Sequence, residues 1–184
     1  MSSISLSTDG CAVVAIDLQP SFLKGIEEAG RVVRRSRFVL QAATLLGVPI
    51  IGTVQNVERM GPTDPLVTDL LPNPIAKMSF SCWGAAKFRE EAASIGARQF
   101  VLVGIETHIC VGLTAMDLLR EGYEVAVCPD AVSAGSIDRH KLGMERLRDA
   151  GAVPIHSETV AYEWMKSAEH TAFRDVLKAV KELR

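Results

Sequence analysis

Short apolar runs alternate with amphipathic stretches along the chain. Each run is rich in β-branched residues and lacks the polar–apolar alternation of a strand with one face in water. Such continuous apolar runs are typical of parallel strands that are covered on both faces. We therefore predict strands at residues 12–17, 48–53, 99–104, 123–128 and 152–156, and a shorter strand at residues 74–77.

Helices are predicted between and after these strands, at residues 27–46, 84–95, 108–121, 137–150, 157–166 and 169–183. The first four end directly before a glycine, which supplies a left-handed C-terminal cap at little steric cost. Strands that alternate with crossover helices predict an α/β protein with one open, doubly wound, mostly parallel sheet. Because no break in composition divides the chain, residues 1–184 are expected to form a single domain.

Residues 56–74 are predicted to be a long loop, because they hold four prolines. Thr63 or Asp64, followed by Pro65, could begin a short helix with proline in its first turn. A loop at a sheet end can serve as a lid or a pocket wall, and irregular covering structure is an equal alternative.

Composition and charge narrow the class of protein. The 184 residues are 48% hydrophobic and 23% charged, with a formal net charge of -2, which is typical of a globular chain. Without a basic excess, neither nucleic acid nor an anionic membrane is an expected partner. The first residues lack the features of a signal peptide, and the four cysteines form no C-x-x-C pair. A cytoplasmic protein with free thiols is the expectation.

Three chemically useful side chains are predicted to meet at one edge of the sheet. Ligands of open parallel sheets bind outside the carboxyl ends of the strands, where the strand order reverses. Asp17 ends the first predicted strand, Lys77 ends the short one, and Cys110 follows the strand at 99–104. A carboxylate, an ammonium and a thiol could therefore converge there, although Asp17 could also merely bond loop N–H groups.

Cys110 differs from the other cysteines by its place at the start of a helix. The partial positive charge there is expected to lower the thiol pKa and to leave the sulfur facing a pocket. Cys11 and Cys128, at strand ends, are predicted to be small buried hydrophobes, and Cys82 is ambiguous. His108 precedes Cys110 by two residues, and such positions of a helix do not face each other.

No metal site is predicted. His108, His140, His156 and His170 are scattered, and no pair has metal-ligand spacing. We expect surface or structural roles for all of them, with His108 the one possible exception. Asp130 lies at the same sheet edge and is expected to cap a turn.

Several motifs resemble those of the isochorismatase-like cysteine hydrolase superfamily, particularly its isochorismatase domain-containing branch. The strings are V-x-x-I-D-L-Q-x-x-F at 13–22, A-K-M-S-F-S at 76–81, V-G-I-E-T-H-I-C-V at 103–111, E-G-Y-E-V-A-V-C-P-D-A-V-S-A at 121–134 and H-S-E-T-V at 156–160. The resemblance implies a three-layer α/β/α fold with a six-stranded parallel sheet. It also implies an assembly of two or more copies.

The same resemblance assigns roles to individual residues. It implies an Asp–Lys–Cys triad of Asp17, Lys77 and Cys110, with no cofactor. It further implies a cis peptide bond between Ile105 and Glu106, and an oxyanion hole made by the backbone N–H groups of Glu106 and Cys110.

Two branches of the superfamily fit less well. Nicotinamidases carry an Asp-x-His and a further histidine for a metal, and no histidine lies between Thr53 and Lys77 here. True isochorismatases cleave a vinyl ether and lack the cysteine. The sequence therefore predicts a metal-independent hydrolase of a small-molecule amide or related acyl C–N bond, acting through a thioester. Alternatives are hydrolysis of an ester or vinyl ether, a non-catalytic binding protein that retains the pocket, and a thiol-redox protein that uses Cys82.

Overall fold

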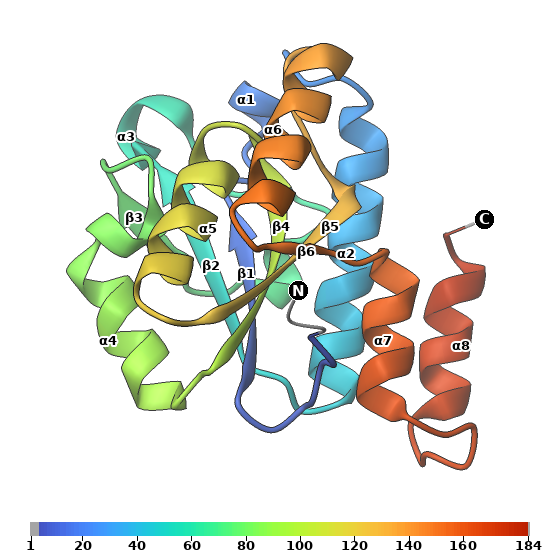
Figure 1. Ribbon diagram of the computed structural model, residues 1–184. Coiled ribbons are helices and arrows are strands. Elements are labelled where there is room, and N and C mark those ends of the chain that lie inside the picture. Colours follow the sequence, from blue (N-terminus) through green and yellow to red (C-terminus); the bar gives the residue numbers. More distant parts are fainter. Residues whose placement is uncertain (1–3, 184) are drawn as a thin grey trace.

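The computed structural model describes residues 4–183, which contain one parallel sheet of six strands (Figure 1). The strand order is β3-β2-β1-β4-β5-β6, and each neighbouring pair is parallel. The strands are β1 (Cys11–Ile16), β2 (Ile50–Gln55), β3 (Ile75–Lys77), β4 (Gln99–Ile105), β5 (Glu124–Ser133) and β6 (Val153–Pro154). The predicted doubly wound α/β fold is confirmed.

Helices cover both faces of the sheet and complete three layers (Figure 1). They are α1 (Pro20–Leu23), α2 (Ala29–Leu45), α3 (Val57–Met60), α4 (Ala86–Ile95), α5 (Cys110–Arg120), α6 (Ile137–Asp149), α7 (Ser157–Met165) and α8 (Phe173–Lys181), with 3₁₀ turns η1 (Thr68–Leu70) and η2 (Cys82–Gly84). Helices α2, α7 and α8 lie on one face, and α4, α5 and α6 lie on the other. None of the helices within 4–183 is long and apolar enough to cross a membrane.

The continuous apolar pattern of β1 reflects burial on both faces. Val13 and Ala15 pack in the core under α2, whereas Val14 and Ile16 pack in the core under α4 and α5. All four side chains are almost fully buried. Because successive side chains point to opposite faces, a strand between two helical layers needs apolar residues at every position.

Some element boundaries differ from those predicted. β5 continues to Ser133, past the expected end at residue 128, because its pairing with β4 shifts register and resumes at Gly104 and Ile105. β6 is only two residues long, and α8 begins at Phe173. The predicted loop at residues 56–74 contains α3 and η1. Neither of them starts at residues 63–65, where a short helix could have begun.

Candidate active site

The strand order reverses between β1 and β4, where a ligand crevice is expected. From β1 the chain builds β2 and β3 on one side, then returns to form β4 on the other side. Asp17 directly follows β1, Lys77 is the last residue of β3, and Cys110 is the first residue of α5. The structure thus brings all three predicted side chains to this end of the sheet.

Asp17 and Lys77 form a buried ion pair. The Lys77 Nζ lies 2.7 Å from Asp17 Oδ2, and the two side chains are 0% and 3% exposed respectively. The ammonium also donates to Gln55 Oε1 at 2.8 Å and to the backbone carbonyls of Ser79 and Phe80. Burial of these charges is tolerable because each is paired and hydrogen-bonded.

Thr53 holds the second carboxylate oxygen of Asp17. Its hydroxyl donates to Asp17 Oδ1 at 2.8 Å, so each oxygen of this carboxylate has a fixed partner. The backbone of Asp17 has a φ of 52°, a left-handed conformation that Asp tolerates better than most residues. The carboxylate therefore has one orientation, set by β2 and β3.

Gln19 and Gln55 connect this network to the backbone. The Gln55 amide donates to the Met78 carbonyl at 2.9 Å while its oxygen accepts from Lys77. Gln19, which is fully buried, accepts from the Gln55 backbone N–H at 2.7 Å and donates back to the Gln55 carbonyl. Thr53 and Gln55 were not singled out from the sequence. Their polar side chains in the buried strand β2 could have indicated that they belong to the site.

The expected lowering of the Cys110 pKa is wrong. Burial raises the pKa of this thiol to about 12, and the charge of Asp17 acts in the same direction. Lys77 opposes the rise but does not overcome it. At neutral pH the resting thiol is therefore protonated, and it shares its pocket with a carboxylate that can accept its proton.

The backbone around Cys110 presents two N–H groups near the thiol. The Ile105–Glu106 peptide is cis, as the family resemblance implies. Gly104, which pairs with Ile16 of β1, has no room for a side chain, because its φ is 113° and an added Cβ would lie 2.1 Å from the Ile16 carbonyl oxygen. Within residues 4–183, the N–H groups of Glu106 and Cys110 donate no backbone hydrogen bond. First-turn N–H groups of a helix lack partners within the helix and are free for a ligand.

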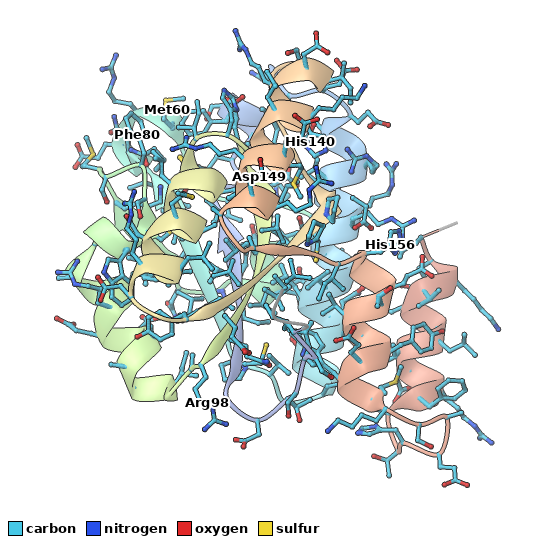
Figure 2. The ribbon with its side chains drawn as sticks, in the orientation of Figure 1. Met60, Phe80, Arg98, His140, Asp149 and His156 are labelled. Atoms are coloured by element: carbon cyan, nitrogen blue, oxygen red, sulfur yellow. The ribbon has the colours of Figure 1, made fainter. Side chains whose placement is uncertain are left out.

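A pocket of about 100 Å³ opens onto the thiol. Its walls are Asp17, Phe22, Gln55, Phe80, Ile105, Glu106, Ile109 and Cys110. Phe80 is 59% exposed. It lies at the same end of the molecule as Met60, whereas Arg98, just before β4, lies at the opposite end (Figure 2). Cys110 faces a pocket, as predicted.

The other cysteines and the histidines lie outside this pocket. Cys11, Cys82 and Cys128 are buried, and burial raises the pKa of all three thiols. The predicted burial of Cys11 and Cys128 is confirmed. His140 bonds to the Thr107 hydroxyl at 2.9 Å. In the part of the chain that the structure describes, no group of three or more His, Cys, Asp or Glu side chains could hold a metal ion.

Asp130 has a capping role, as expected, but at a distant helix. Its carboxylate accepts from the backbone N–H of Ser157, at the start of α7, at 3.0 Å, and from the Ser157 hydroxyl. Asp130 is not among the walls of the pocket at Cys110.

Comparison with known proteins identifies the class to which this fold belongs. The family model of the isochorismatase domain matches residues 11–159. Isochorismatase domain-containing protein 2 of Xenopus laevis is 38% identical over 168 residues, which are 90% of this chain and 81% of that protein. The chain therefore belongs to the isochorismatase family, whose members are generally hydrolases.

Solved structures agree with this assignment. The MAR1 ribonuclease of Caenorhabditis elegans superimposes with a TM-score of 0.91 at 29% identity, covering 97% of this chain and 93% of that one. The YcaC gene product of Escherichia coli, described as an octameric hydrolase of unknown specificity, has a TM-score of 0.87 at 21% identity and full coverage of both chains. At the latter identity the likeness shows the fold alone.

Proposed function

We propose that the protein is a metal-independent cysteine hydrolase that cleaves the acyl C–N bond of a small-molecule amide through a thioester on Cys110. The observation that carries this proposal is the position of Asp17, whose carboxylate is paired with Lys77 and lines the same pocket as the Cys110 thiol. A protonated thiol beside a held carboxylate is a nucleophile with its general base in place.

The acylation step follows from these contacts. Asp17 takes the thiol proton as the Cys110 sulfur attacks the amide carbonyl carbon, and the carbonyl oxygen becomes an oxyanion. The backbone N–H groups of Glu106 and Cys110 would donate to that oxyanion. The C–N bond then breaks, and Asp17 returns the proton to the departing amine, leaving an acyl thioester.

The deacylation step uses the same groups. Asp17 takes a proton from water, the resulting hydroxide attacks the thioester carbonyl, and the proton passes back to the Cys110 sulfur as the carboxylic acid leaves. Lys77 keeps a positive charge beside Asp17 throughout and so favours its ionised form between the two steps.

A screen of small carboxamides and carbamoyl compounds for ammonia release tests this proposal. A substrate quenched in acid should leave an acyl mass adduct on the peptide that contains Cys110. Cys110→Ala should abolish both the ammonia and the adduct. Turnover by Cys110→Ala would instead mean direct attack by water, which favours ester or vinyl ether hydrolysis.

Two other functions predict different results, one with this panel and one with RNA. A non-catalytic binding protein would bind members of the panel without turnover. Hydrolysis of RNA, the activity in the name of the C. elegans protein, needs basic groups to receive phosphates. The pocket walls contain Asp17 and Glu106 and no basic side chain, so we expect no cleavage of an RNA oligonucleotide.

We also propose that the protein works in the cytoplasm as a homo-oligomer of two or more copies. The octameric state in the description of the E. coli protein supports an assembly. Light scattering of the purified full chain gives its mass in solution, and a mass of one copy at working concentration would contradict this expectation.

A further inference from the structure

We propose that the pocket selects small amides that carry no carboxylate, and that the Glu106 side chain receives an N–H or ammonium donor of the substrate. This inference rests on the proposed function, because it concerns the substrate of the same site. It assigns to Glu106 a specificity-determining role that is separate from its backbone N–H.

The Glu106 carboxylate has one fixed oxygen and one available oxygen. Oε2 accepts from the Gly135 backbone N–H at 2.9 Å, which holds the side chain against the start of α6. No partner for Oε1 occurs within residues 4–183, and the side chain is only partly buried where it lines the pocket. A carboxylate held at one oxygen is a ready acceptor for a ligand donor.

The charge of the pocket is negative. Asp17 is neutralised by its ion pair with Lys77, whereas Glu106 has no ion pair in the described part of the chain. The exposed Arg139 also approaches Gly135, but no contact within ion-pair distance joins it to Glu106. Since the pocket walls hold no basic side chain, a substrate carboxylate would meet Glu106 with no cation in ion-pair contact with it.

The remaining walls limit the size and polarity of the acyl group. Phe22, Phe80, Ile105 and Ile109 are apolar, and both ends of the Gln55 amide are already bonded. The volume of about 100 Å³ is well below the roughly 300 Å³ at which pockets for drug-sized ligands begin. The pocket thus fits a short acyl group with one donor directed at Glu106.

Charged thiol reagents test the pocket without any need for turnover. The Cys110 thiolate attacks the sulfenyl sulfur of a methanethiosulfonate, forms a mixed disulfide and displaces methanesulfinate. We would measure the ratio of the rates of the cationic 2-aminoethyl and anionic 2-sulfonatoethyl reagents at Cys110 by peptide mass spectrometry. This rate ratio is divided by the same ratio measured with a small free thiol. A change in the Cys110 pKa does not affect the result, because both reagents react with the same fraction of thiolate.

The expected normalised ratio is at least about tenfold in favour of the cation. Glu106→Gln, which keeps the shape and the backbone N–H, should bring the ratio close to one. Glu121→Gln removes the same charge from the exposed far end of α5 and should leave the ratio unchanged. A native ratio near one, or a ratio that Glu106→Gln does not lower, would overturn the inference.

Matched amides extend the test to catalysis. β-Alaninamide is a cationic isostere of butanamide, and malonamate is a small amide with a carboxylate. We expect kcat/KM to fall in the order β-alaninamide, butanamide, malonamate. Glu106→Gln should lower kcat/KM for β-alaninamide at least about tenfold and raise it for malonamate. Preferred hydrolysis of malonamate would overturn the inference and leave the cysteine hydrolase intact. If the thiol reagents give the expected ratios but no amide is hydrolysed, the proposed function is overturned instead.

Discussion

The Lys77 ammonium lies 2.7 Å from the Asp17 carboxylate, although the two residues are 60 positions apart in the chain. The pair joins the carboxyl ends of β3 and β1, with β2 between them. Because both side chains are almost completely buried, neither charge has water as an alternative partner. The negative charge next to Cys110 therefore depends on an ion pair that only the assembled sheet can form.

Replacing Lys77 should remove activity and weaken the fold. Lys77→Met keeps most of the length of the side chain but leaves the Asp17 carboxylate buried without its partner. We expect kcat to fall at least about 100-fold and the free energy of unfolding to fall by about 3–5 kcal/mol. Amide hydrolysis assays and urea unfolding measure these effects, with Lys87→Met as a control on the exposed side of α4. Activity within about threefold of the native value would exclude Lys77 from the reaction.

Thr53 should act as a positioning residue. Thr53→Val removes the hydrogen bond to Asp17 Oδ1 and is expected to lower kcat about tenfold with little change in KM. Thr114→Val is a matched control, because this buried threonine bonds to the Cys82 backbone N–H and does not touch Asp17. Equal loss of kcat in both variants would mean that Thr53 has only a structural role.

Asp17 should suppress the reactivity of Cys110 in the resting enzyme while enabling turnover. Its charge contributes to a thiol pKa of about 12, so Asp17→Asn should lower that pKa. We expect alkylation of Cys110 by iodoacetamide at pH 8 to become at least about tenfold faster, while amide hydrolysis is lost. In the native protein the alkylation rate should keep rising up to pH 10 and beyond. A plateau below pH 9 would show that the thiol pKa is not raised and would contradict this prediction.

No catalytic metal should be needed. No suitable cluster of metal ligands occurs in residues 4–183, and the proposed steps use only side chains and backbone. Dialysis against a strong chelator is expected to leave kcat/KM unchanged, and the dialysed protein should contain no stoichiometric zinc or iron. Loss of activity that a single added metal restores would contradict this prediction.

The sequence by itself determined the kind and order of the main elements. It also determined the edge of the sheet at which the candidate catalytic side chains lie. Apolar runs and glycine caps are local signals, so β1 and β4 were placed to within a residue or two. The positions of Asp17, Lys77 and Cys110 relative to their strands were also predictable, because carboxyl ends of parallel strands share one edge. The cis bond before Glu106 was accessible only through family resemblance.

Only the tertiary structure decided how these groups affect one another. The strand order places Thr53, 36 positions away, on the free oxygen of Asp17, and no local pattern encodes such a contact. The thiol pKa was misjudged for the same reason. The start of a helix is visible in the sequence, but burial of the thiol beside a carboxylate depends on every element around Cys110. Here burial and the charge of Asp17 outweigh the charge of Lys77.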